Sequence, residues 1–145
     1  MAAGNDNRVV WRVGLPCARE RAFAALATRE GREAFWAETA PEHDGAIHFA
    51  FPNGVKARSA VLQNEPPSLY EIDYFGMPTR FTLEGAAPDK TVLTVDARNI
   101  PDADFQDVHA GWVSVLMAMK CWLATGYDLR NHDVQQSWDQ RFVEN

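Results

Sequence analysis

Cysteine is scarce in this chain of 145 residues, which holds only Cys17 and Cys121. The two lie far apart, and neither belongs to a pair with the spacing of a metal site or a redox motif. We therefore expect both to be reduced thiols packed inside a cytoplasmic protein. Long apolar stretches are also missing: no run of about 18 such residues exists, so no helix is expected to span a bilayer. The opening residues, MAAGNDNR, lack the apolar segment of a secretion signal.

Positive charge is a second shortage. The formal net charge is −6, and Lys and Arg are not clustered, whereas a nucleic acid or an anionic membrane would require a basic patch. Glycine-rich phosphate loops and the Gly-x-Ser-x-Gly elbow are absent from the sequence. A Ser-His-Asp arrangement is not supported, because Ser114 and His109 fall on opposite faces of a predicted helix.

The histidines form no metal motif. There are four of them, and none has the paired spacing with cysteine or carboxylate residues that zinc or iron requires: His43, His48, His109 and His132. We predict no metal site and no other cofactor.

The chain is rich in apolar residues, with 46% hydrophobic and 11% aromatic residues, a composition typical of a compact globular protein. Its length suits one domain spanning residues 1–145, with a loose polar leader at 1–7. Residues 126–145 form a tail that we expect to pack on the domain or on a partner subunit. Within it, Asn131 or Asp133 is predicted to cap a short helix that runs through Trp138.

The most strongly patterned stretch is DFQDVHAGWVSVLMAMKCWLAT, residues 104–125. At 100° per residue, its larger apolar side chains and one histidine share a helical stripe: Phe105, Val108, His109, Trp112, Leu116, Met119 and Leu123. Asp104 or Asp102 can cap the first turn, and Gly126 suits a left-handed terminal residue. The opposite face is small rather than charged, so we expect the tail or a second subunit to cover it: Ala110, Gly111, Ser114, Ala118 and Cys121.

The rest of the chain alternates between strand and helix patterns. Val9–Leu15 is predicted to be a strand, followed by the helix CARERAFAALAT and by a second short helix, REGREAFW, capped by Thr28. After the loop AETAPEHDG, about five segments alternate apolar and polar residues, interrupted by turns and the loop GAAPDK. These strands have one covered face, and only helix 104–125 is long enough to cover it. We therefore predict an α+β fold with a curved antiparallel sheet of about six strands wrapped around that helix.

Motifs over nearly the whole chain resemble those of one superfamily. They are PCARERAFAALAT after the first strand, AFWAE, the FPNG turn, EPPSLYEIDYFG, HAGWVSVLMAMKCWL and the closing DLRNHDVQQSWDQRFVEN. On these motifs the chain resembles the SRPBCC superfamily of START-like, helix-grip proteins, and within it the C-terminal domain of heat-shock-protein ATPase activators. The resemblance implies a helix-grip fold with a hydrophobic cavity between sheet and last helix. It implies no single activity, because the superfamily holds lipid carriers, hormone receptors, cyclases, oxygenase subunits and chaperone regulators.

The candidate ligand site lies on the apolar face shared by sheet and helix. Pockets are mostly apolar with a few polar groups, and the residues expected to line one are Trp36, Phe49, Phe51, Tyr70, Tyr74, Phe81, His109, Trp112, Leu116 and Met119. The same side chains would also suit a solid core. His109 is expected at the cavity mouth, as a ligand contact or an acid–base group. The alternative is a buried histidine satisfied by one protein partner.

Three functions fit these features. We expect the binding of a small hydrophobic or amphipathic molecule, without catalysis and with a homodimer as one way to cover the long helix. A cyclase- or dehydratase-like enzyme that uses His109 is the alternative. A chaperone ATPase regulator is the third; such activators add a second domain to this one, and we expect none within these 145 residues.

Overall fold

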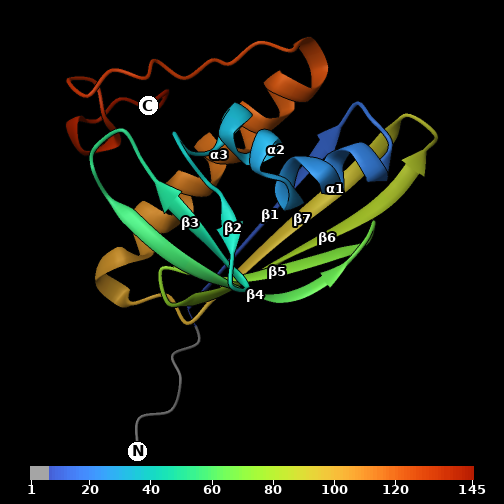
Figure 1. The fold of residues 1–145 in the computed structure, drawn as a ribbon, viewed down its shortest axis with the longest axis horizontal. Coiled ribbons are helices and arrows are strands. Elements are labelled where there is room, and N and C mark those ends of the chain that lie inside the picture. The colour runs from blue at the N-terminus through green and yellow to red at the C-terminus, as the bar shows by residue number, and fades with distance from the viewer. Residues whose placement is uncertain (1–6) are drawn as a thin grey trace, which may run out of the picture.

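A seven-stranded antiparallel sheet and one long helix across it make up most of the molecule (Figure 1). The computed structural model describes residues 7–145. The strands and α-helices are β1 (Arg8–Leu15), α1 (Arg19–Ala27), α2 (Arg29–Phe35), β2 (Glu42–His43), β3 (Ala46–Ala50), β4 (Lys56–Glu65), β5 (Leu69–Tyr74), β6 (Met77–Ala87), β7 (Lys90–Arg98) and α3 (Phe105–Thr125). This order confirms the predicted α+β fold. The predicted leader lies outside the described residues except for Asn7, whose amide donates to the Ile100 carbonyl at 2.8 Å.

The strands lie in the order β1-β7-β6-β5-β4-β3-β2, and each neighbouring pair is antiparallel. The strand beyond the expected six is β2, two residues long, inside the stretch predicted as a loop. The predicted loop GAAPDK is also different, because β6 continues through Ala87 and only Pro88 and Asp89 turn. Neither segment buries alternate side chains, so backbone pairing forms there without the sequence pattern that predicts it.

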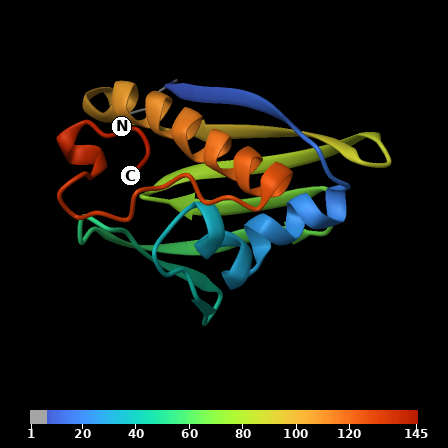
Figure 2. The same cartoon turned by 90° about the horizontal axis from the view of Figure 1, so that it is seen from above.

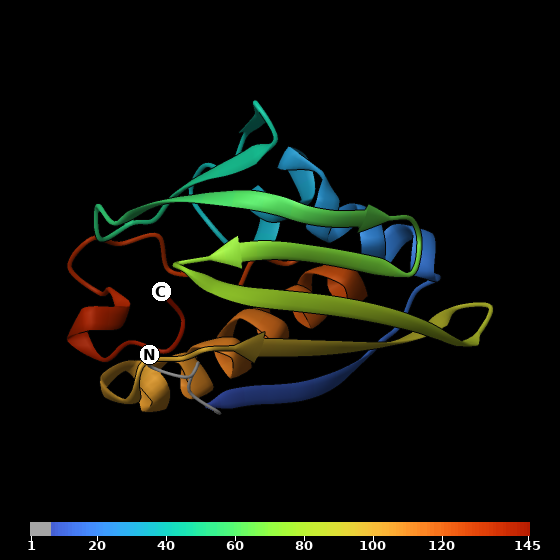
Figure 3. The ribbon, with the colours of Figure 1, turned by 90° about the horizontal axis from the view of Figure 1, so that it is seen from below.

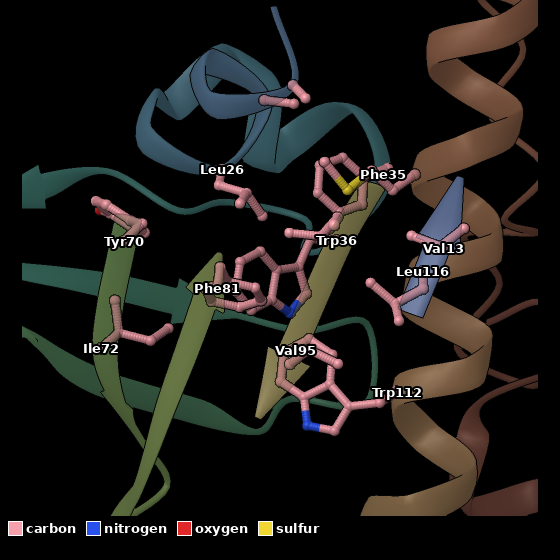
Figure 4. Packing of buried hydrophobic residues seen from close by; sticks show 14 of the residues in the cluster. Val13, Leu26, Phe35, Trp36, Tyr70, Ile72, Phe81, Val95, Trp112 and Leu116 are labelled. Atoms are coloured by element: carbon pink, nitrogen blue, oxygen red, sulfur yellow. The ribbon is translucent and has the colours of Figure 1, made fainter. Parts of the chain in front are cut away.

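The core lies between the concave face of the sheet and α3. Side chains at alternate positions of the strands are buried there, among them Val13, Phe81 and Val95. Trp112 and Leu116 of α3 pack against these strand side chains, so sheet and helix share one apolar cluster (Figure 4). Each large side chain buried in this way contributes about 1.5–3 kcal/mol relative to exposure.

The two ends of α3 differ in how well they were predicted. Gly126 has φ of 76° and its N–H donates to the Trp122 carbonyl at 2.8 Å, which confirms the left-handed end. The predicted carboxylate cap is wrong: a 3₁₀ turn over Asp102–Asp104 leads into the helix, and neither side chain caps it. Asp102 instead accepts a hydrogen bond from the Asn7 amide.

The short helices carry a buried cation that no sequence pattern predicts. Thr28 caps α2 as predicted, accepting the Gly31 N–H at 3.0 Å. On the same helix Arg32 is only 1% exposed. Its guanidinium donates to the Ala40 carbonyl at 2.8 and 3.1 Å and to the Leu26 carbonyl at 3.1 Å. These bonds tie the end of α1 to the segment that leads into the sheet, because carbonyls buried there need donors.

The tail runs back beside α3 towards the N-terminal end of that helix (Figures 1 and 2). The short helix predicted between Asn131 and Trp138 is absent from this described segment. Asn131 and Asp133 instead accept hydrogen bonds from N–H groups two residues ahead, each at 2.8 Å, a turn geometry that competes with helix formation. A 3₁₀ turn follows over Trp138–Gln140, with Ser137 and Gln140 forming its capping box.

Two further sequence expectations concern cysteines and membranes. Cys17 is buried, Cys121 is partly buried, and both are free thiols. Within residues 7–145, none of the helices combines the length and apolar character needed to cross a bilayer.

Candidate ligand pocket

A pocket of about 400 Å³ opens at one end of the sheet. One wall is the N-terminal half of α3, and the second comprises the β3–β4 and β5–β6 turns. Residues of the tail line the third side. Figure 3 shows from below how the tail lies beside α3 and the β3–β4 turn. The volume falls within the range of about 300–1,000 Å³ usual for small-molecule sites.

The helix supplies two adjacent apolar faces rather than one. Trp112, Leu116, Met119 and Leu123 are buried against the sheet. A second face, turned by about 90° at 100° per residue, lines the pocket with Val108, Gly111, Val115 and Ala118. The face of small residues that was expected to be covered as a whole has two environments. Gly111, Ser114 and Ala118 line the pocket, whereas Ala110 is exposed.

Aromatic rings form the inner end of the pocket. Trp36, just after α2, packs on Tyr74 and Trp112 with ring centroids 5.5 and 5.7 Å apart. The Trp36 indole N–H donates to the Tyr74 hydroxyl at 3.2 Å. Burial raises the pKa of the Tyr74 phenol, so this group stays neutral and can still donate its own proton. Packed aromatic pairs of this kind hold one another in fixed orientations.

The outer edge carries an aromatic ring on a strained backbone. Phe75, at the β5–β6 turn, has φ of 53° and is 47% exposed. Its ring lies 6.1 Å from that of Phe51, on the neighbouring β3–β4 turn. A bulky residue in the left-handed region costs about 1–2 kcal/mol, so the turn holds an apolar ring at the pocket edge at a cost in stability.

Three contacts from the tail hold it against α3 and the β3–β4 turn. The Trp138 indole N–H donates to Asp107 at 2.8 Å, and the Ser114 hydroxyl donates to the Val143 carbonyl at 2.5 Å. The Asn53 amide donates to Asp139 at 2.8 Å. The tail thus makes a wall of the pocket within the same chain.

Arg130 anchors the start of the tail to the loop after α2. Its side chain is 6% exposed and forms an ion pair with Asp128 at 2.9 Å. The two terminal nitrogens also donate to the Ala37 and Glu33 carbonyls at 3.0 and 2.8 Å. Nη2 also donates to the second Asp128 oxygen at 3.0 Å, so the guanidinium uses four of its five N–H groups inside the protein.

His132 strengthens this anchor by bridging two carboxylates. Nδ1 lies 2.5 Å from Glu38 and Nε2 lies 2.6 Å from Asp128. Because carboxylates accept hydrogen bonds, both ring nitrogens donate only when the imidazole is protonated. Partial burial opposes that charge, but the hydrogen bonds to Asp128 and Glu38 raise the pKa of His132 above its usual value. Partial burial likewise opposes ionisation of Asp128, yet bonds from Arg130 and His132 lower its pKa to about 2.

The predicted site residues fall into three groups. Trp36, Phe51, Tyr74 and Trp112 line the pocket. The others on the sheet and helix belong to the solid core beside it: Phe49, Tyr70, Phe81, Leu116 and Met119. Burial raises the pKa of Tyr70 to about 12; the charge of nearby Arg32 opposes this rise, and Glu42 adds to it.

His109 does not lie at the cavity mouth, which corrects the position expected for it. Its ring is on the exposed side of α3, 4.9 Å from the ring of Trp11 on β1. Trp11 also donates its indole N–H to the His109 carbonyl at 3.2 Å. The stripe expected to face the sheet spans about 100°, and His109 lies at its edge, beside the first strand rather than above the pocket.

Sequence reasoning missed the tail residues that complete the site. Leu129, Arg130, Trp138, Asp139, Val143 and Glu144 all line the pocket. The mixture of large apolar and polar residues in the tail indicated that it packs on something, but not on what. No group of three or more metal-ligating side chains comes together among residues 7–145.

Comparison with known proteins adds a likeness of fold. No family model and no curated protein matches the chain. A solved structure from Staphylococcus saprophyticus aligns with a TM-score of 0.74 at 20% identity, over 85% of this chain and 96% of that one. The Aha1 dimer from Colwellia psychrerythraea gives 0.74 at 21% identity, over 82% and 97%. DynU16, described as a protein in the dynemicin biosynthetic locus, gives 0.72 at 22%, over 86% and 49%. These alignments establish the helix-grip fold.

Proposed function

We propose that the protein binds a small hydrophobic or amphipathic molecule in the pocket between α3, the strand turns and the tail. The pocket itself carries the proposal: it has a volume of about 400 Å³ and walls built from Trp36, Tyr74, Trp112 and other apolar side chains. A strained, exposed Phe75 at its edge supports the same reading, since such backbone strain is found mostly at functional positions.

Binding is favoured over the cyclase- or dehydratase-like alternative by the position of His109. A general acid or base must come within hydrogen-bond reach of the reacting atom, and the His109 ring packs on Trp11 outside the pocket. The proposed site therefore comprises the pocket-lining aromatic residues, with His109 left out. We place this activity in the cytoplasm, a proposal supported by the two free thiols.

We also propose that the protein is related to the heat-shock ATPase activator branch and forms a homodimer. The fold likeness to the Aha1 dimer supports the first part. For the second, the outward face of α3 presents exposed apolar side chains, Val113 and Met117, that the tail leaves uncovered. Regulation of a chaperone ATPase is the further alternative that this relationship would bring.

Native mass spectrometry of the freshly purified protein, compared with the denatured mass, tests the binding proposal. We expect extra mass in the native spectrum that disappears on denaturation and gives the mass of the ligand. A ligand-free native spectrum, together with no change in tryptophan fluorescence on titration with decanol, would contradict the proposal, because Trp36, Trp112 and Trp138 all line the pocket.

A further inference from the structure

We propose that the ligand is a cationic amphiphile, a protonated organic amine whose apolar part enters the pocket while its ammonium group lies at the acidic edge. This inference rests on the proposed function and specifies the chemical class that the same pocket takes. Three observations support it: the carboxylates that line the pocket, the ion pair that already occupies Arg130, and the exposed ring of Phe75.

The charged side chains that line the pocket are mostly negative. Asp104 and Asp107 come from the start of α3, and Asp139 and Glu144 come from the tail. None of the four takes part in an ion pair within residues 7–145. Their hydrogen-bond partners are neutral: the Trp138 indole for Asp107, and side-chain amides for Asp139 and Glu144. The negative charge at this edge is therefore available to a ligand.

The helix N-terminus explains part of this pattern but not all of it. Carboxylates in a first helical turn are stabilised by the helix dipole, so Asp104 and Asp107 have a structural reason to be there. Asp139 and Glu144 lie on a different segment, which reaches the same pocket edge from more than 30 residues further along the chain. The two segments together therefore place four carboxylates among the residues that line one pocket.

Within residues 7–145, the pocket lining offers an anionic ligand no cation that is without an ion-pair partner. Arg130 is the basic residue that lines the pocket, and it is already paired with Asp128 at 2.9 Å. Two further N–H groups donate to the Ala37 and Glu33 carbonyls. A fatty acid or other carboxylate would therefore meet like charges without a compensating partner, which disfavours it.

The aromatic ring at the edge suits a cation as well as an apolar chain. Phe75 exposes 47% of its surface, and its ring packs on Tyr74 and Phe51 with centroids 4.7 and 6.1 Å away. Aromatic faces attract organic ammonium groups, and this attraction adds to that of nearby carboxylates. An amphiphile with an apolar chain and an ammonium head matches both parts of the site.

Three probes of equal chain length test this inference: decylammonium, decanol and decanoate. Each is titrated at pH 7, the two ions below their micelle concentrations and decanol below its solubility limit. Tryptophan fluorescence and calorimetry report the binding. We expect decylammonium to bind about tenfold more tightly than decanol, a difference that about 1.4 kcal/mol would produce. Decanoate should bind more weakly than decanol. The preference for decylammonium should shrink as salt is raised from about 0.01 to 0.15 M, because the carboxylates are near the surface.

A matched pair of triple variants assigns the preference to the pocket. Asp104→Asn, Asp139→Asn and Glu144→Gln together remove three charges while keeping an acceptor oxygen at each position. The control, Glu20→Gln, Glu84→Gln and Asp89→Asn, changes the net charge equally at exposed positions that do not line the pocket. We expect the first variant to lose most of its preference for decylammonium over decanol, and the control to keep that preference.

The outcomes separate this inference from the proposed function. The cationic assignment would be overturned if decanoate bound as tightly as decylammonium or more tightly. It would also be overturned if the preference for decylammonium over decanol fell equally in both triple variants. Either result would leave the pocket as a ligand site. Failure of all three probes to bind would overturn both. Thermal unfolding of each variant confirms that it folds before its binding is compared.

Discussion

The imidazole of His132 is one of the groups that link the tail to the body of the domain. His132 lies between Glu38 and Asp128, and Asp128 in turn holds Arg130 against the loop after α2. These four side chains fix the point where the tail leaves α3 and turns back towards the pocket. Charge at one residue therefore affects how firmly one wall of the pocket is held.

The stability of this anchor should depend on pH. The folded pKa of His132 is raised, so its contribution is fully present below the unfolded value of about 6.5 and is lost as pH rises through the folded value. We expect the unfolding free energy of the wild type to fall as pH rises above about 6.5, and His132→Gln to lack that part of the fall. Because the group is partly exposed, the difference should not exceed about 1 kcal/mol. Chemical denaturation across this range measures it.

Two comparisons make that result specific. His43→Gln, at an exposed histidine outside the pocket, should keep the wild-type fall in stability. Identical pH profiles for wild type and His132→Gln would contradict the ionic bridge. The contribution of Asp128 to the unfolding free energy depends on acid pH instead. Because its pKa is about 2, this contribution is lost as pH falls from about 4 towards 2.

At the scale of elements, glycines mark where helices approach a neighbour and where they leave space. A Cβ on Gly31 of α2 would lie 2.5 Å from the Cα and carbonyl oxygen of Ala25 in α1. A Cβ on Gly111 of α3 would meet nothing within 4 Å. The first glycine permits close helix packing, whereas the second faces the pocket.

Alanine at these two positions should have opposite effects on stability. We expect Gly31→Ala to destabilise the protein by about 1–3 kcal/mol, because backbone atoms of α1 must move. Gly111→Ala should stabilise it by up to about 1 kcal/mol, because alanine favours the helix. Thermal unfolding, in which 1 kcal/mol corresponds to about 2–4 °C for a domain of this size, distinguishes them. Equal melting temperatures would show that α1 and α2 are not packed as closely as described.

The elements with strong periodicity were the ones predicted well from sequence. Helix 104–125 and the alternating strands follow from side-chain spacing, and burial then determines which face is covered. The pocket could not be predicted in the same way. One wall of the pocket consists of Val108, Gly111 and Val115, and these residues line a pocket because the tail packs opposite them. The position of the tail could not be predicted, since its sequence has no periodic pattern. His109 was misplaced because a stripe of about 100° includes residues at its edge whose neighbours depend on the sheet.

The burial of Arg32 could not be predicted from the sequence either. Its burial depends on two backbone carbonyls, those of Leu26 and Ala40, that only the fold brings together. An arginine on a short helix with polar neighbours is normally exposed. Nothing in its local sequence distinguishes it from Arg29, which is exposed on the same helix.

At the scale of the whole molecule, the outward face of α3 determines the expected assembly. Met117 is 52% exposed and Val113 is 42% exposed. We expect the wild type to sediment as a dimer and Met117→Asp to shift it to a monomer, because a charge in an apolar interface costs free energy. Val55→Asp, at a similarly exposed apolar residue on the pocket side, is the control and should remain dimeric. A wild type that is monomeric at high concentration would contradict the proposed assembly.

The most direct test of the central claim is decanol binding to Gly111→Leu beside the wild type. The leucine side chain would project from α3 into the pocket, into space where the structure has no neighbouring atoms within 4 Å of the Cβ. If the pocket binds the ligand, the variant should fold with an unchanged or higher melting temperature and lose decanol affinity by about tenfold or more. A variant that binds decanol as tightly as the wild type would show that the ligand site lies elsewhere.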